Sequence, residues 1–210
     1  MRVFVTGATG FIGSAIVREL LGAGHRVLGL SRSDAGAEAL AAAGADVHRG
    51  SLEDLDGLKR GAAAADGVIH TAFIHDFSNF AANAKTDQVA LDAMAGELAG
   101  SGKPFIVSSG ILGLPPQRPG TEDDVPASTL PRKSETSGLA AAARGVRAMA
   151  IRLAPSVHGD GDHGFVPALI ECARQQGFAF YVGEGTNRWP AVHRMDAAKL
   201  YRLALEIVPA

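Results

Sequence analysis

The sequence has little cysteine, few aromatic residues and almost no net charge. Cys172 is the one cysteine among 210 residues, which excludes an internal disulfide and a cysteine-based zinc site. A formal net charge of −2 gives no electrostatic reason to expect nucleic acid or an anionic membrane as a partner. No apolar run reaches the roughly 18 residues of a membrane span, and no signal-peptide cleavage site follows the apolar N-terminus. We therefore expect a soluble, cytoplasmic protein that binds neither nucleic acid nor a membrane.

Apolar residues make up 47% of the chain and fall in short runs that alternate with longer helical segments. This alternation is typical of a parallel sheet with crossover helices. The expected strands are 2–6, 26–30, 45–48, 67–71, 104–108 and 146–153. The expected helices are 11–21, 34–43 with Asp34 as N-cap, 79–99, 134–143, 165–176 and 195–207.

Gly7, Gly10 and Gly13 lie between the first expected strand and its helix. That context, rather than the glycines alone, indicates a dinucleotide-binding loop. Gly7 permits the tight turn, Gly10 lets the backbone approach a pyrophosphate, and Gly13 lets the helix pack close to the strand. The helix N-terminus then offers N–H groups to the phosphates. The sequence predicts an α/β domain that binds a nicotinamide dinucleotide, with a ligand-free glycine turn as the alternative.

The end of the second expected strand bears on which nicotinamide dinucleotide is bound. NAD-binding domains usually place an acidic residue there to hold the ribose 2′-OH. This chain has Ser31 and Arg32 instead. A guanidinium binds a phosphate in a bidentate manner, and a serine leaves room for one. We expect NADP(H) to be preferred, with NAD(H) and a purely solvent-facing Arg32 as the alternative.

Five segments in order resemble the extended or atypical short-chain dehydrogenase/reductases, specifically the NAD-dependent epimerase/dehydratase family; they are 5–14, 68–72, 107–110, 152–159 and 192–196. The resemblance implies a Rossmann-type, doubly wound parallel sheet with a reduced C-terminal substrate lobe. It implies a single NAD(P)-binding domain over 1–210, with substrate-lobe segments at about 156–195. Helices 79–99 and 134–143 resemble those that form the dimer interface in this family, so a homodimer is one candidate state, and the oligomeric state stays open.

The resemblance implies contacts to the cofactor at three places and one catalytic residue. At the pyrophosphate these are Gly7, Thr9, Gly10, Phe11, Ile12 and Gly13. At the adenosine they are Ser31, Arg32, Ser51 and Leu52, with Ser51 standing where the family often has an Asp. At the ribose and nicotinamide they are Thr71, Ala72, Phe73, Ser108, Pro155 and Ser156. Ser109 is the expected catalytic residue and would hydrogen-bond a substrate oxygen.

The family's Tyr-x-x-x-Lys pair is missing from this chain. In that pair the lysine lowers the pKa of the tyrosine, which then exchanges a proton with the substrate oxygen. The sequence holds two tyrosines, Tyr181 and Tyr201, and neither has a lysine four residues further on. In the segment that should carry the pair, Pro131 stands in the place of the tyrosine and Glu135 in that of the lysine.

Other residues are candidates for the proton transfer. Histidine is the natural proton carrier near neutral pH, and His158, His163 and His193 all lie in loop-like contexts. We predict His158 as the second catalytic residue beside Ser109, with the other two histidines or water as alternative proton sources. The segment 158–163 alternates imidazole and acidic groups, but its spacing does not require a metal, and none is expected. His75 and Asp76 follow the fourth expected strand on the cofactor side of the sheet; we expect a plain loop role for them, with contact to the substrate as the alternative.

Two functions fit these residues. The first is an NAD(P)(H)-dependent oxidoreductase or epimerase that acts on a small carbonyl or alcohol substrate without the Tyr-x-x-x-Lys dyad. A general acid contributes only about 10²–10⁴-fold to the rate, so its loss need not abolish hydride transfer. The second is a non-catalytic NADP(H)-binding module for redox sensing or regulation, which the missing dyad favours. The retained Ser108 and Ser109 favour the enzyme.

A titration with NADPH and with NADH tests the cofactor prediction. We expect tighter binding of NADPH, followed by nicotinamide fluorescence, and loss of that preference in Arg32→Ala, because the guanidinium would hold the 2′-phosphate. Equal binding of both nucleotides by the unaltered protein would contradict the prediction.

Overall fold

A computed structural model describes residues 1–115, 118–127 and 129–207. Its main sheet has six parallel strands in the order β3-β2-β1-β4-β5-β6. The strands are β1 (Arg2–Thr6), β2 (Arg26–Ser31), β3 (Asp46–Arg49), β4 (Gly67–His70), β5 (Pro104–Gly110) and β6 (Arg147–Leu153). The order reverses between β1 and β4, so a crevice opens there at the carboxyl ends of the strands, where ligands bind in folds of this type.

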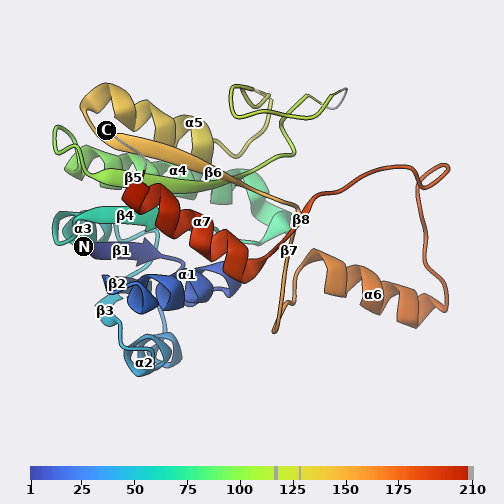
Figure 1. The fold of residues 1–210 in the computed structure, drawn as a ribbon, viewed down its shortest axis with the longest axis horizontal. Coiled ribbons are helices and arrows are strands. Elements are labelled where there is room, and N and C mark those ends of the chain that lie inside the picture. Colours follow the sequence, from blue (N-terminus) through green and yellow to red (C-terminus); the bar gives the residue numbers. More distant parts are fainter. Residues whose placement is uncertain (116–117, 128, 208–210) are drawn as a thin grey trace.

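Helices cover both faces of the sheet (Figure 1). One face packs against α3 (Leu55–Ala63), α4 (Phe80–Glu97) and α5 (Ser134–Leu139); the other packs against α1 (Phe11–Gly22), α2 (Asp34–Ala42) and α7 (Arg194–Ile207). The alternation of side chains along a strand produces the two cores. In β1, Val3 and Val5 belong to the core under α1 and α7, whereas Phe4 belongs to the opposite core. The expected doubly wound Rossmann-type fold is confirmed.

Several expected elements differ from those observed. The helix expected over 134–143 is α5 followed by a 3-10 helix, η2 (Ala140–Arg144). The N-cap of α2 is Ser33, whose hydroxyl accepts from the Gly36 N–H, and Asp34 is the first helical residue. No bounds were predicted for α3, because glycines interrupt its apolar pattern. Gly61 is needed there, since a Cβ would lie 2.4 Å from the Phe4 ring.

Beyond β6 the chain forms a smaller unit. Strands β7 (Ser156–His158) and β8 (Ala191–His193) pair in parallel, and both were missed because three residues carry too little pattern. Between them lies α6 (Phe165–Gln176), as expected, but none of its residues is buried. Figure 1 shows α6 standing apart from the sheet. The expected substrate-lobe segments correspond to this unit, and their role stays a prediction.

A second 3-10 helix, η1 (Phe77–Asn79), leads into α4. Over the described ranges of the chain, no helix combines the length and the hydropathy needed to cross a bilayer.

The packing of α1 generates a stability prediction. Leu20 is fully buried, whereas Leu200 on α7 is 51% exposed. Leu20→Ala is expected to lower the free energy of unfolding by roughly 2–5 kcal/mol, because a cavity remains in the core. The matched Leu200→Ala should change it by less than about 0.5 kcal/mol. Equal effects in urea denaturation would show that α1 does not pack as described.

Candidate active site

The glycine loop packs tightly against the end of β4. Gly7 has a φ of +68°, and a Cβ there would lie 2.7 Å from the Ala72 nitrogen and from the Thr71 hydroxyl oxygen. A Cβ on Gly13 would lie 1.9 Å from the Gly7 carbonyl oxygen. Gly10 is the N-cap of α1, and no side chain caps that helix end. The loop 7–13, called the cofactor cradle below, therefore keeps the first N–H groups of α1 open for a phosphate. This arrangement fits a dinucleotide.

The first turn of α1 is covered from the C-terminal part of the chain. The guanidinium of Arg194 lies 4.9 Å from the centre of the Phe11 ring. The ring of His163 packs edge-on against the same phenyl ring, with the two ring centroids 6.1 Å apart. Thr9, the other predicted contact next to Gly10, is exposed. The expected pyrophosphate site thus has an open side at Thr9 and a cationic neighbour at Arg194.

Ser31 and Arg32 lie at the carboxyl end of β2. The Ser31 hydroxyl is buried and donates to the Ser33 carbonyl oxygen at 3.0 Å. Arg32 is exposed, and among the described residues its side chain has no hydrogen bond or ion pair. By contrast, the nearby Arg49 donates to an Asp34 carboxylate oxygen at 2.8 Å. Arg32 is therefore the guanidinium at this edge that an incoming anion can engage without breaking an ion pair.

The two predicted contacts after β3 differ in their surroundings. The Ser51 hydroxyl accepts from the Glu53 N–H at 3.2 Å, within a turn. Leu52 is 8% exposed and belongs to the core beneath α3. Ser51 is half-buried and accessible to a ligand, whereas the Leu52 side chain contributes to packing.

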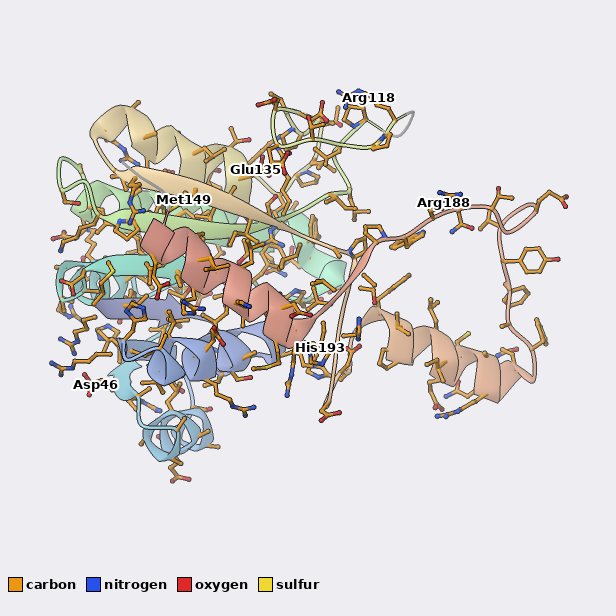
Figure 2. The ribbon with its side chains drawn as sticks, viewed as in Figure 1. Asp46, Arg118, Glu135, Met149, Arg188 and His193 are labelled. Carbon is orange, nitrogen blue, oxygen red and sulfur yellow. The ribbon has the colours of Figure 1, made fainter. Side chains whose placement is uncertain are left out.

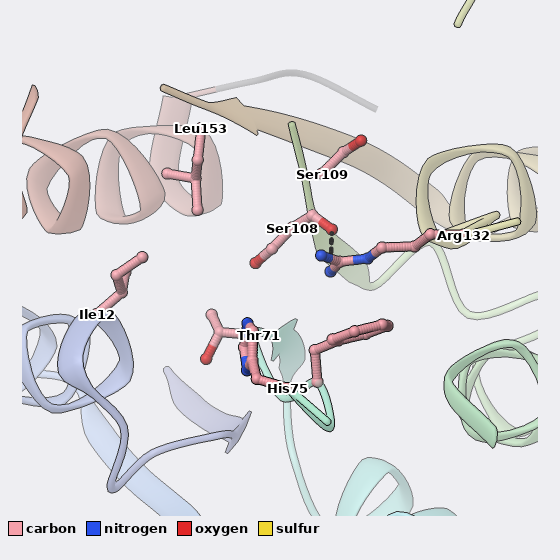
Figure 3. A pocket seen from close by; sticks show the side chains of 8 residues that line it. Ile12, Thr71, His75, Ser108, Ser109, Arg132 and Leu153 are labelled. Atoms are coloured by element: carbon pink, nitrogen blue, oxygen red, sulfur yellow. Dashed lines mark hydrogen bonds between the residues drawn. The ribbon is translucent and has the colours of Figure 1, made fainter. Parts of the chain in front are cut away.

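A pocket of about 90 Å³ lies at the carboxyl ends of β4, β5 and β6 (Figure 3). It is lined by Ile12, Thr71, Phe73, His75, Ser108, Ser109, Arg132 and Leu153. Five of these are sequence-predicted cofactor or catalytic residues. Three other predicted cofactor contacts do not line this pocket, although each is half-buried; they are Ala72, Pro155 and Ser156.

His158 lies outside this pocket. It is exposed on β7, and its ring packs against that of His193 with the ring centroids 5.6 Å apart. Figure 2 places His193 at the start of α7. The structure therefore does not bring His158 and Ser109 together within the pocket.

The hydroxyls of Ser108 and Ser109 point to opposite sides of β5 (Figure 3). The Ser108 hydroxyl donates to the His70 carbonyl oxygen at 2.9 Å and lies 2.6 Å from the Tyr201 hydroxyl. Burial raises the pKa of Tyr201 to about 12, although the hydrogen bond with Ser108 and the charge of Arg132 act in the opposite direction. Tyr201 is thus a neutral, buried phenol, unlike the acidified tyrosine of the family's dyad.

Arg132 is the cation of the pocket. Its Nε donates to the Ser134 hydroxyl at 2.7 Å, its Nη2 donates to the Ser108 carbonyl oxygen at 3.2 Å, and its guanidinium lies 4.2 Å above the Phe73 ring. Burial lowers its pKa, while Asp87 acts to raise it, and an arginine remains charged in proteins. Nη1 has no hydrogen-bond partner among the described residues. One charged edge of Arg132 is therefore available to a ligand.

Behind Arg132 runs a chain of buried polar side chains. Ser134 donates to one carboxylate oxygen of Asp87 at 2.5 Å, and the Nε2 atom of His70 lies 3.0 Å from the other. The Nδ1 atom of His70 lies 2.8 Å from the Thr6 hydroxyl. Burial acts to raise the pKa of Asp87, but the hydrogen bonds from His70 and Ser134 and the charge of Arg132 outweigh it and leave that pKa lowered. Asp87 is therefore an ionised carboxylate in the interior.

The position where the family has the lysine of its dyad holds an ion pair in this chain. Glu135 is buried on α5, where Figure 2 labels it, and forms an ion pair with Arg152 of β6 at 2.6 Å. Arg152 also donates to the Thr121 carbonyl oxygen at 2.9 Å. A carboxylate and a guanidinium thus join α5, β6 and the preceding loop where the family has its lysine.

The neighbouring residues His75 and Asp76 have different surroundings. Asp76 accepts from the N–H and the hydroxyl of Ser78, as the cap of η1. His75 lines the pocket, and partial burial together with the charge of Arg132 lowers its pKa below 6.5. Its imidazole is therefore neutral at pH 7.

Arg132, Asp87 and Ser134 escaped the sequence analysis. One signal was present: a histidine at the end of an apolar strand, His70, must find a buried partner. Its partner on α4 could not be identified without the tertiary structure. Among the described residues, no group of three or more His, Cys, Asp or Glu side chains is placed to hold a metal.

Both the fold and the cradle define a dinucleotide-binding Rossmann domain. The model of the NAD-dependent epimerase/dehydratase family matches residues 3–209. The chain belongs to this family, which supports an NAD-dependent epimerase or oxidoreductase type of activity.

Three comparisons illustrate the relationship. An uncharacterised protein of Schizosaccharomyces pombe is 52% identical over 98% of this chain and 71% of its own length. The 2-alkyl-3-oxoalkanoate reductase of Stenotrophomonas maltophilia is 29% identical over 98% of this chain and 66% of its own. The Bordetella bronchiseptica enzyme WbmH, in a crystal structure with NAD+, superposes with a TM-score of 0.79 at 21% identity, over 99% of this chain and 73% of that one.

The raised pKa of Tyr201 predicts a loss of stability in alkali. In the folded state the phenol keeps its proton to about pH 12, compared with an ordinary pKa near 10. Its contribution is complete below pH 10 and is lost as the pH rises towards 12. Urea denaturation should therefore show a steeper fall in stability over this window than in Tyr201→Phe. Identical falls in the two proteins would contradict the prediction.

Proposed function

We propose that this protein is an NADP(H)-preferring oxidoreductase for a small carbonyl or alcohol substrate, in which Arg132 acts on the substrate oxygen. The observation that carries the proposal is the charged edge of Arg132 in the pocket beside Ile12 and Thr71. Those two residues extend from the glycine loop and from β4, so the pocket adjoins the predicted cofactor site. The site therefore pairs a cofactor cradle with a fixed cation.

A guanidinium can replace one function of the missing tyrosine but not the other. Fixed hydrogen-bond donors stabilise the negative charge that develops on a carbonyl oxygen during hydride transfer. Arg132 is already held by Ser134, Ser108 and Phe73, so little reorganisation is needed. It cannot release a proton, however, because arginine stays protonated. A separate group must exchange the proton.

His75 is the proposed proton carrier. It lines the same pocket, and its lowered pKa keeps the imidazole ready to accept a proton at pH 7. In the direction of alcohol oxidation, the hydroxyl proton passes to His75, directly or through water, while Arg132 stabilises the oxygen. A nicotinamide bound at the glycine loop would supply the hydride chemistry in either direction.

Ser109 stays the residue that the sequence predicts to bind the substrate oxygen. It lines the pocket, but Figure 3 shows its hydroxyl on the other side of β5 from that of Ser108. We therefore assign the main stabilisation of the oxygen to Arg132. Neither role is assigned to His158, which lies on β7.

The preference for NADP(H) rests on Arg32. Its exposed guanidinium has no ion-pair partner among the described residues, so a 2′-phosphate would meet an uncompensated cation. The similarity to a 3-oxoalkanoate reductase supports reduction of a ketone as the first reaction to test. Suitable probes are acetoacetate and ethyl acetoacetate, which differ in whether a carboxylate accompanies the ketone.

A non-catalytic NADP(H)-binding module is the second candidate. The ion pair of Glu135 with Arg152 favours it, since this pair fills the place of the catalytic lysine. Such a module would bind NADPH without oxidising it in the presence of any carbonyl probe. The pocket cation favours the enzyme, because a sensor has no need of it.

Arg132→Ala tests the proposal. We expect kcat for NADPH-dependent reduction of ethyl acetoacetate to fall by about 10²–10³-fold, since one oxyanion donor is lost. Added guanidinium should restore part of this rate, while the dissociation constant for NADPH stays within about twofold. The measurement is the decrease of NADPH absorbance.

Arg144→Ala provides the matched control, because Arg144 is exposed and precedes β6 at the amino edge of the sheet. It should leave kcat unchanged. An unaltered kcat in Arg132→Ala would refute the assigned role of Arg132. NADPH binding without turnover of either probe by the unaltered protein would favour the non-catalytic module.

A further inference from the structure

The buried side chains behind Arg132 form one continuous hydrogen-bonded chain from β1 to the pocket. It runs through Thr6, His70, Asp87, Ser134 and Arg132, which come from β1, β4, α4, α5 and the loop before α5. Thr6, His70 and Asp87 are each 0% exposed and Ser134 is 1% exposed. Polar groups so completely removed from water are costly unless they are paired, so their arrangement is strongly determined.

The direction of each hydrogen bond follows from the chemistry of its groups. An ionised carboxylate only accepts, so both Ser134 and the Nε2 atom of His70 donate to Asp87. Since the Ser134 hydroxyl proton is used in this way, its oxygen is left to accept from Arg132. When His70 is neutral, its Nδ1 atom accepts the hydroxyl proton of Thr6. Each member thus fixes the orientation of the next.

Arg132 and Asp87 carry opposite charges, with Ser134 between them. Among the described residues that line the pocket, none is acidic and Arg132 is the one arginine. Breaking one member of a buried charge pair leaves the other uncompensated. The guanidinium is therefore held by both a geometric and an electrostatic constraint.

We propose that Asp87 and Ser134, oriented by His70, are positioning residues that hold Arg132 in its reactive orientation toward the substrate oxygen. This inference rests on the proposed function for the role of Arg132. Its structural part, the immobilisation of the guanidinium by Ser134 and Asp87, can be measured without substrate. The hydrogen-bonded network ends at Thr6, directly before the glycine loop, so it connects the pocket with the cofactor cradle.

Ser134→Ala is the decisive variant, because it removes the bridging hydroxyl and leaves both charges in place. The first readout is the Nε–H proton signal of Arg132 in a nitrogen-15 correlation spectrum, identified by its loss in Arg132→Lys. In the unaltered protein this proton is bound to Ser134 and should exchange slowly with water. In Ser134→Ala the signal should shift and broaden as exchange accelerates.

The second readout is kinetic. With ethyl acetoacetate as the probe, Ser134→Ala should lower kcat by at least about tenfold, since a small misplacement of a catalytic group is costly. The dissociation constant for NADPH should stay within about twofold. The matched control is Ser137→Ala, a buried serine on the same helix whose side chain has no hydrogen bond among the described residues. It should change neither readout.

The possible outcomes separate the two proposals. An unchanged Nε–H signal and an unchanged kcat in Ser134→Ala overturn the positioning role. A lost signal with an unchanged kcat upholds the immobilisation of Arg132 and refutes its role in catalysis. Asp87→Asn should reproduce the effect of Ser134→Ala; if that variant fails to fold, Ser134→Ala still decides, because it creates no unpaired charge.

Discussion

The ionised carboxylate of Asp87, enclosed at 0% exposure beneath the pocket, is the constraint on which the site depends. A buried charge requires donors on every side, and His70 and Ser134 provide them while Arg132 supplies the opposite charge. These partners come from β4, α5 and the loop before α5. Satisfying one carboxylate therefore fixes the relative positions of the elements that surround the pocket.

The close approach of the glycine loop to β4 places the cofactor cradle beside this network. Gly7 and Gly13 allow contacts that any Cβ would prevent, and Thr71 then donates its hydroxyl to the Thr6 carbonyl oxygen at 2.8 Å. Thr6 also contacts His70 through its side chain. The residue before the loop thus takes part in both the cradle and the buried chain, which ties the two halves of the site together.

The family's usual chemistry uses a tyrosine acidified by a lysine, and this chain lacks that pair but holds two guanidinium–carboxylate arrangements near the site. Glu135 with Arg152 joins α5 to β6, while Asp87 with Arg132 reaches the pocket through Ser134. The first is a direct ion pair without a free edge toward the pocket. The second leaves one edge of the guanidinium exposed to a ligand, and it is the arrangement that we propose acts on a substrate oxygen.

The sequence by itself determined the α/β class, the glycine cradle and most strands, because the period of apolar residues and the spacing of Gly7, Gly10 and Gly13 are local properties. It also excluded the Tyr-x-x-x-Lys dyad. Only the tertiary structure decided that Arg132 enters the pocket and that His158 does not line it. Ser108 on β5 bonds to Arg132 directly and Asp87 on α4 reaches it through Ser134, and both lie far from Arg132 along the chain. Side-chain burial and hydrogen bonding between such segments leave no periodic signal, so they arise only when the sheet brings the segments together.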